Sequence, residues 1–191
     1  MTPMNSPQGA PQKKSTAVVL LIVLGAGGLA MVCCIGMLAA IAVPNFLKFN
    51  VRAKQAEAKS NLKGLYTAER AYFAEKDAFS DEFATIGFKP EPGNRYLYVL
   101  SPSGTVIEAD SRTAPTGGTA AYLAAIPPGV RAEAGVHGTC PDDCYVTAIA
   151  VGNLDNDSTF DVWSVSTQDR TFGGVKVPAG QPFIHVNDVE N

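Results

Sequence analysis

The sequence predicts an α+β protein in which one long N-terminal helix precedes several short strands. An uncharged apolar run covers residues 17–43, apolar residues continue at helical spacing to residue 76, and short β-rich segments separated by turn residues follow. The chain has 191 residues, which is enough for one ordinary domain with an added segment but short for two full domains. We therefore expect one small domain carried on a helix.

The apolar run is long enough to cross a membrane. As a helix, residues 17–43 would reach ~40 Å, against a hydrocarbon core of ~30 Å. A secretory signal peptide is the alternative, because Lys13 and Lys14 precede the run, but the apolar part of such peptides has only ~7 to 15 residues. We expect an uncleaved single-pass anchor that follows a polar cytoplasmic tail at residues 1–16. The two lysines favour an N-terminus inside, which places the head in the periplasm or outside the cell.

Small residues within the run indicate a surface for helix self-association. Gly36 and Ala40 have the spacing that lets two membrane helices approach closely, and Pro44 and Phe46 extend this candidate surface. Glycine is common in membrane helices in any case, so ordinary packing is the alternative.

Residues 44–76 read as an amphipathic stem helix. Leu62, Leu65 and Tyr72 recur at helical spacing, while charged residues such as Lys59 and Glu69 fall largely between the apolar positions. This stem carries a net charge of +4, whereas the chain from residue 77 onward carries −9. A basic stretch beside a membrane segment favours lipid head groups or like neighbours as partners, and we expect no nucleic-acid binding.

Residues 77–170 form the expected β-rich head. Phe83 and Phe88 are the apolar anchors of its first connecting segment. Turn residues separate the expected strands, which cover 95–100, 105–109, 145–151 and 159–166, and a helical turn is expected at 120–125. Residues 171–191 are rich in Gly and Pro, so we expect a C-terminal tail that lies over the surface or is partly mobile.

The helix carries a resemblance to a known family. The stretch IGMLAAIAVPNF at 35–46, followed by AKQAEAK at 53–59, resembles the N-terminal helix of type IV pilins, and segments 87–96 and 151–163 are similar to short-headed bacterial pilin-like proteins. The resemblance implies a pilin-like fold, in which the second half of the helix packs on a small antiparallel sheet. It also implies a noncatalytic structural or interaction protein of the bacterial inner membrane. The expected partners are the lipid bilayer and like pilin subunits or the assembly proteins of a pilus or a type II secretion apparatus, in which the chain is a minor subunit.

Two positions depart from the family pattern. Type IV pilins carry a Gly at the end of a cleaved leader and a Glu inside the apolar stretch. When the chain is aligned through Pro44, these positions fall on Ile22 and Gly27. A carboxylate in lipid is costly and is retained where it has a function, so its absence favours a permanently anchored protein. A processed fibre subunit of a pilus or pseudopilus remains the alternative.

Four cysteines occur, in two pairs. Cys140 and Cys144 enclose a short loop, and in an oxidising compartment they are expected to form a disulfide. Cys33 and Cys34 lie in the apolar run and are expected to serve as packing residues. His137 precedes Cys140 by three residues, but a zinc site here lacks a convincing fourth ligand.

Oxygen-bearing side chains alternate at Asn153, Asp155, Asp157 and Asp161, which is a pattern that suits Ca²⁺. The EF-hand pattern fails, because Ser158 stands where that loop needs Gly. The alternative is a hairpin turn, with strand alternation placing Asp161 on the solvent face. An anchored extracytoplasmic calcium- or ligand-binding module is therefore the second functional hypothesis.

No constellation in the sequence supports catalysis. We find neither a nucleophile with a neighbouring His nor a phosphate-binding Gly loop nor a zinc signature, and His185 in the tail is expected to be a surface residue. We therefore expect a protein that is not an enzyme.

Overall fold

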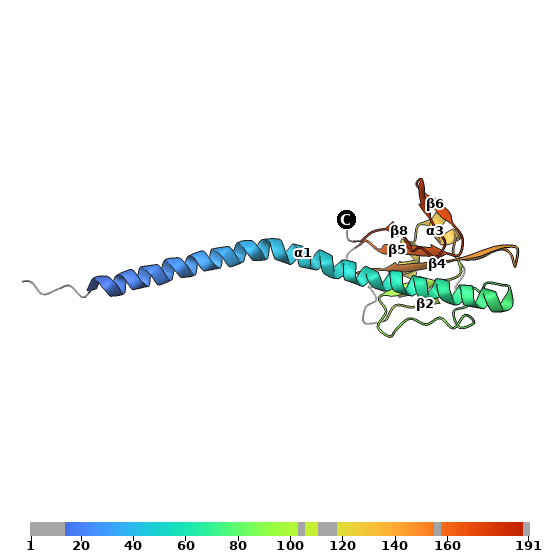
Figure 1. The fold of residues 1–191 in the computed structure, drawn as a ribbon, viewed down its shortest axis with the longest axis horizontal. Helices are drawn as coiled ribbons and strands as arrows, with labels where there is room; N and C mark the ends of the chain where they lie inside the picture. Colours follow the sequence, from blue (N-terminus) through green and yellow to red (C-terminus); the bar gives the residue numbers. More distant parts are fainter. Residues whose placement is uncertain (1–13, 103–105, 111–117, 155–157, 189–191) are drawn as a thin grey trace, which may run out of the picture. The chain divides into compact units, whose positions relative to one another are not determined.

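The computed structural model describes residues 14–102, 106–110, 118–154 and 158–188. The chain divides into two compact units, residues 1–47 and 48–191 (Figure 1). Helix α1 (Lys14–Lys76) contributes to both units. The prediction of one long helix is confirmed, and the helix begins three residues earlier than expected.

The first unit contains the apolar part of α1. Residues Val18–Ala42 form a helical segment long and apolar enough to cross a membrane, and none of the side chains described in it is buried. Leu21 and Val32, for example, are 71% and 68% exposed. Such an exposed apolar surface is unfavourable in water, which is consistent with the expected membrane anchor.

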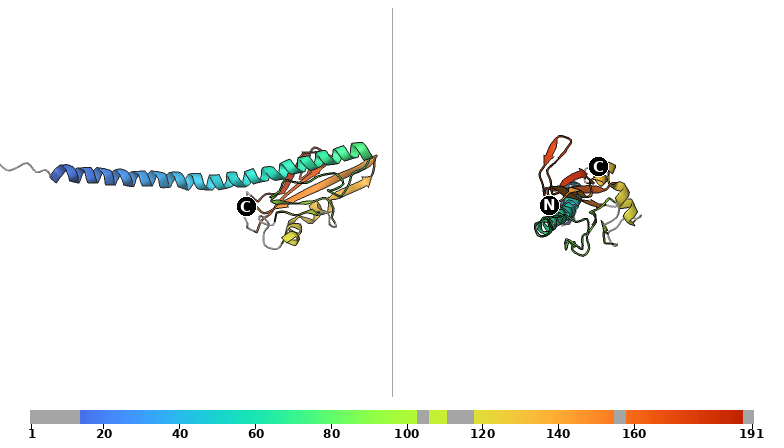
Figure 2. Two further views of the ribbon diagram at one scale, coloured as in Figure 1. Left: turned by 90° about the horizontal axis from the view of Figure 1, so that it is seen from below. Right: turned by 90° about the vertical axis from the view of Figure 1, so that its right-hand side faces the viewer.

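The second unit is built on a six-stranded antiparallel sheet with the order β2-β1-β4-β5-β8, in which β3 also pairs with β4 (Figures 1 and 2). Its strands are β1 (Tyr96–Val99), β2 (Val106–Ile107), β3 (Gly135–Thr139), β4 (Asp143–Gly152), β5 (Asp161–Ser166) and β8 (Phe183–Val186). A separate hairpin consists of β6 (Arg170–Phe172) and β7 (Val175–Val177). Two short helices, α2 (Gly118–Ala125) and α3 (Pro128–Ala132), precede β3.

Both faces of the central sheet are covered. On one face, Leu62 and Leu65 of α1 belong to the same buried cluster as Tyr98 of β1 and Trp163 of β5. A second cluster on the opposite face brings β1, β4 and β5 together with Tyr122 of α2. Figure 2 shows α1 and α2 on opposite sides of the sheet. The expectation that the stem packs on a small antiparallel sheet, which the resemblance to type IV pilins implied, is therefore confirmed.

The prediction of a C-terminal tail at residues 171–191 is wrong where this segment forms strands, and residues 189–191 lie outside the described residues. Gly173 and Gly174 have φ values of 54° and 84°, which allow the tight turn between β6 and β7. Residues Phe183–Val186 then form the edge strand β8, which pairs with β5. The Gly and Pro residues of this segment lie in the turns and connections between strands. Strand β3 was not predicted from the sequence. Two of its five residues are glycines, which weaken the strand pattern.

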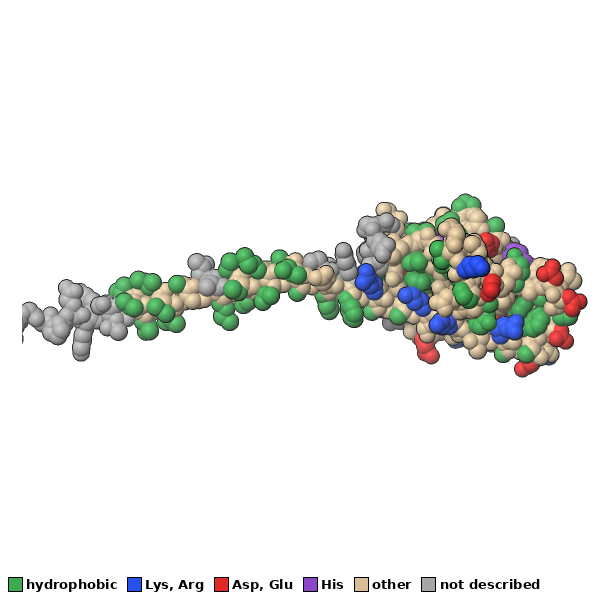
Figure 3. Space-filling view, turned by 45° about the horizontal axis from the view of Figure 1, so that its top comes forward, with side chains coloured by type: hydrophobic (Ala, Val, Ile, Leu, Met, Phe, Trp, Pro, Cys, Tyr) green, Lys and Arg blue, Asp and Glu red, His purple; other side chains and the backbone are tan. Residues whose placement is uncertain are grey.

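Charged side chains are unevenly distributed over the surface of the second unit. Figure 3 shows basic side chains spread over the near face, a group of acidic side chains at one end, and further acidic side chains elsewhere on the same face. The helix α1 ends beside the turn between β3 and β4 (Figures 1 and 2), and exposed carboxylates lie on both segments.

Candidate functional site

The candidate self-association residues lie along the apolar part of α1. Gly36 and Ala40 are exposed, Phe46 is 65% exposed, and a Cβ atom added at Gly36 meets no atom within 4 Å. Gly36, Ala40 and Pro44 follow at intervals of four residues, so they share one side of a helix. The surface needed for close helix packing is present, and self-association through it stays a prediction.

Asp161 anchors the interface between α1 and the sheet. Its Oδ1 accepts hydrogen bonds from Gln55 Nε2 at 3.0 Å and from the Asp188 backbone N–H at 2.8 Å. Its Oδ2 accepts a hydrogen bond from the Tyr96 hydroxyl at 2.8 Å, and the Trp163 indole N–H lies at 3.4 Å. Burial and the neighbouring Asp161 carboxylate raise the pKa of the Tyr96 hydroxyl, which therefore remains a donor.

The expectation that Asp161 faces solvent is wrong, because its side chain is completely buried. Strand alternation correctly groups Asp161 with Trp163 and Val165 on one face of β5. That face, however, is the one covered by α1. Alternation alone shows which residues share a face, but it does not show which face is covered.

The remaining candidate calcium ligands do not form a described site. Asp155 and Asp157 lie outside the described residues, and Asn153 is buried. Among the residues that the structure describes, no group of three or more His, Cys, Asp or Glu side chains is arranged to hold a metal. The oxygens of Asp161 already accept hydrogen bonds from protein donors. Calcium binding by these four residues therefore stays a prediction.

The expected disulfide between Cys140 and Cys144 is confirmed, with a Cα–Cα distance of 4.9 Å. It closes the turn between β3 and β4, where Gly138 pairs with Cys144. Gly138 has a φ of 78°, and a Cβ atom there would collide with the carbonyl group of Asp143. A glycine is therefore required at this point of the cross-linked turn. The two other cysteines, Cys33 and Cys34, are exposed on the apolar helix.

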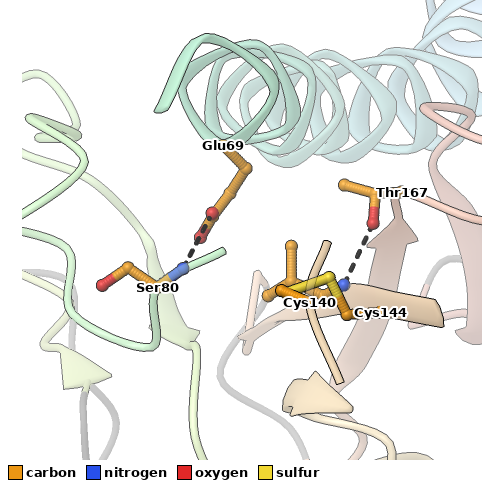
Figure 4. Close-up of a disulfide and its surroundings, with 6 residues drawn as sticks. Glu69, Ser80, Cys140, Cys144 and Thr167 are labelled. Carbon is orange, nitrogen blue, oxygen red and sulfur yellow. Dashed lines mark hydrogen bonds between the residues drawn. A yellow bond between two sulfur atoms is a disulfide. The ribbon is translucent and has the colours of Figure 1, made fainter. Parts of the chain in front are cut away.

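Glu69 lies near this disulfide, at the interface of α1 with the sheet (Figure 4). The side chain is fully buried, one of its carboxyl oxygens accepts a 3.3 Å hydrogen bond from the Ser80 backbone N–H, and the other has no hydrogen-bond partner. Burial raises the pKa of Glu69 to about 7; the Ser80 hydrogen bond opposes this rise, and the nearby Asp81 adds to it. We expected Glu69 between the apolar positions, but its spacing from Leu65 and Tyr72 is itself helical and could have indicated burial.

A Ser–His pair lies between β5 and β8. The Ser164 hydroxyl is 2.7 Å from His185 Nε2 and also accepts a hydrogen bond from Arg170 Nη1 at 2.8 Å. Burial and the neighbouring Arg170 charge lower the pKa of His185 to about 4, so this histidine is neutral near pH 7. His185 is half-buried and paired with Ser164, so it is not the simple surface residue that was expected. Ser164 is itself fully buried, which makes the pair structural rather than nucleophilic.

These features define a class of protein. A helix with an exposed apolar part, whose amphipathic part completes the core of a small antiparallel sheet, is the arrangement of a pilin-like structural protein. The family model described as "Type IV pilin PilA" matches residues 49–126. The chain is also 38% identical over 194 residues to the protein described as "Type IV major pilin protein PilA" of Myxococcus xanthus (strain DK1622), in a match that covers 83% of this chain and 88% of that protein. The chain belongs to the type IV pilin family, whose members are structural and noncatalytic.

Proposed function

We propose that this pilin is a membrane-anchored minor subunit of a type IV pilus system and that it associates with like subunits without leaving the membrane. The observation that carries the proposal is the exposed apolar segment Val18–Ala42, since it has no protein partner within the described chain. A bilayer satisfies such a surface, and so do the apolar helices of neighbouring subunits. The function is therefore packing rather than catalysis.

Anchoring follows from the length and flanks of this segment. Its 25 residues carry no charge and, at ~1.5 Å per residue in a helix, are long enough to cross a bilayer core of ~30 Å. Lys13 and Lys14 precede it and favour an N-terminus inside. We propose that the second unit then lies on the periplasmic side of a bacterial inner membrane.

Retention in the membrane follows from two positions. Gly27 stands where the family resemblance expects a Glu, and Ile22 stands where it expects the Gly that precedes the cleavage point. Gly27 is exposed and offers no side chain that could pair with the amino group of a neighbouring subunit. The relative from Myxococcus is named a major pilin, whereas these two positions support a minor, unprocessed subunit here.

Fractionation of cells tests this proposal. We expect the native chain in the membrane pellet and absent from fibres sheared off the cell surface. A variant that combines Ile22→Gly and Gly27→Glu restores these two family positions, and we expect a fraction of it to be shortened and to appear in sheared fibres. A variant with Gly25→Glu alone places the carboxylate at a position that the family pattern does not use and serves as the control. Abundant native chain in sheared fibres would contradict retention.

A further inference from the structure

A groove lies between α1 and β8 in the second unit. It has a volume of about 460 Å³, and its lining combines cations with apolar groups. Lys59, Ser60 and Lys63 line it from α1, Trp163 lines it from β5, and residues 181–184 line it from the segment at β8. The groove is open at the surface, so a protruding polar segment of another molecule has access to it.

The two lysines of this groove are available to a partner. Both are exposed, and among the residues that the structure describes neither has a carboxylate within 4.0 Å of its ammonium group. Lys59 Nζ lies 4.9 Å from the centre of the Trp163 ring, which holds the charge over the floor of the groove. Lys63 is one helical turn further along α1. Two cations above an apolar floor favour an anionic partner.

The same chain carries a suitable anionic surface, which we call the acidic end. It consists of exposed carboxylates where α1 finishes and in the turn between β3 and β4, and its members are Glu75, Asp77, Asp81, Asp142 and Asp143. Figure 3 shows a group of acidic side chains at one end of the second unit. Lys63 and Glu75, which is the member of the acidic end within α1, are separated by twelve positions, or about 18 Å along the helix, so Lys63 does not reach the acidic end of α1 in its own chain.

We propose that the groove at Lys59 and Lys63 binds the acidic end of a second copy of this chain. The inference rests on the proposed function, because it names the surface through which like subunits meet. The contact joins two different surfaces, so each copy keeps a free groove and a free acidic end, and further copies can add in the same direction. Complementary charge also fixes which neighbours can dock, since two grooves or two acidic ends repel each other.

Zero-length cross-linking of the full chain in native membranes tests the contact. A carbodiimide joins a lysine to a carboxylate only where the two groups touch. We mix isotopically light and heavy chains and expect light–heavy peptide pairs that link Lys59 or Lys63 to residues of the acidic end. Because screening weakens exposed charge pairs, the yield of these pairs should fall at least about threefold between roughly 0.05 and 0.5 M salt.

Charge reversal separates a specific contact from general attraction. Lys59→Glu with Lys63→Glu should reduce the cross-links at the acidic end at least about tenfold, and Glu75→Lys with Asp142→Lys should reduce those at the groove equally. A chain with all four substitutions should regain association. The cross-links should then join the lysines introduced at positions 75 and 142 of one copy to the carboxylates introduced at positions 59 and 63 of another. Lys89→Glu, which lies in neither surface, is the control and should leave the yield unchanged.

Co-purification of two differently tagged full chains distinguishes the possible failures. If the copies co-purify but the cross-links lie elsewhere or are absent, the groove contact is overturned while association of like subunits stands. If the copies do not co-purify and no cross-links form, both proposals are overturned. If the fourfold variant does not regain association while each double variant remains folded by circular dichroism, charge complementarity is rejected as the basis of the contact.

Discussion

The two parts of α1 use the same backbone geometry for opposite purposes. Between Val18 and Ala42 the helix is apolar on all sides and none of the side chains described in it is buried. From residue 48 onward it is amphipathic, and side chains such as Leu62 and Leu65 are completely or almost completely buried against the sheet. The difference shows that one helix can satisfy a membrane with one part and supply a missing core to a small domain with the other.

The hydrogen bonds of Asp161, which join β5 to the second part of α1, should be the contacts whose loss destabilises the second unit most. Asp161→Ala removes an acceptor shared by Gln55, Tyr96 and the Asp188 backbone and leaves their donors buried. We expect a loss of about 4 kcal/mol in the free energy of unfolding of the second unit. Urea unfolding of the full chain in detergent, followed by Trp163 fluorescence, measures this loss. A loss below about 1 kcal/mol would show that water replaces these contacts.

A pair of leucine substitutions tests the comparison directly. Leu62→Ala opens a cavity beneath the stem and should cost about 3 kcal/mol. Leu24→Ala, at a position that is 65% exposed, should change the unfolding of the second unit by less than about 0.5 kcal/mol. The same urea experiment compares the two variants. Equal losses would mean that the two parts of α1 do not have separate functions.

A charge in the apolar part should affect insertion but not folding of the head. Met31→Arg places a guanidinium at an exposed position inside the candidate span and should cost about 3 kcal/mol of insertion free energy. We expect a larger fraction of the chain to remain in the supernatant when membranes are pelleted. The rate at which a protease digests the second unit should stay unchanged. Lys14→Arg, which keeps the flanking charge, is the matched control and should insert as the parent does.

The buried Glu69 predicts a pH-dependent stability. Its pKa of about 7 in the folded protein exceeds the ordinary value of 4.5, so the folded state binds the proton more tightly than the unfolded state. The stability that this group contributes is complete below pH 4.5 and is lost as the pH rises through 7, by about 3 kcal/mol in total. Glu69→Gln should therefore be more stable than the parent near pH ~8.5, and its advantage should shrink toward pH ~5.

The parent and the variant must be compared at each pH, because His185 acts in the opposite direction. Its pKa is lowered to about 4, so stability from the neutral histidine is present above pH 6.5 and is lost as the pH falls through 4. Subtracting the two unfolding curves removes this contribution. A difference between parent and variant that does not change with pH would contradict the assignment of a neutral Glu69.

The disulfide should give the smallest effect. Cys140→Ser with Cys144→Ser opens a loop of only a few residues, so we expect a loss of about 2 kcal/mol on loop-entropy grounds. Hydrogen exchange should increase at the ends of β3 and β4 and remain unchanged in α1 from residue 48 onward. Increased exchange along the stem would show that the turn also supports the helix–sheet interface.

Much of this fold could be predicted from sequence, because the pattern that indicates the long helix extends over many residues. Periodic apolar positions and the absence of charge located both parts of α1, and alternation located β1, β4 and β5. The packing of the stem on the sheet came from family resemblance, since periodicity shows that a face is apolar without showing what covers it. Asp161 illustrates this limit, because alternation assigns it to the right strand and to the wrong environment.

Short elements and long-range contacts were harder to anticipate. Strand β8 has four residues and follows a Gly- and Pro-rich stretch, so its pairing with β5 left little local signal. The groove at Lys59 and Trp163 joins segments about a hundred residues apart in the sequence, and no local pattern relates them. The disulfide, in contrast, was predictable because its two cysteines are four positions apart.

The intact mass of the chain purified from native membranes is the most direct test of the central claim, that the apolar part of α1 is a permanent anchor. We predict a mass that includes the segment before residue 17 and the whole apolar run. A mature chain that begins at Val23, which is the position after the one aligned with the family's leader Gly, would contradict the claim and would identify a processed fibre subunit.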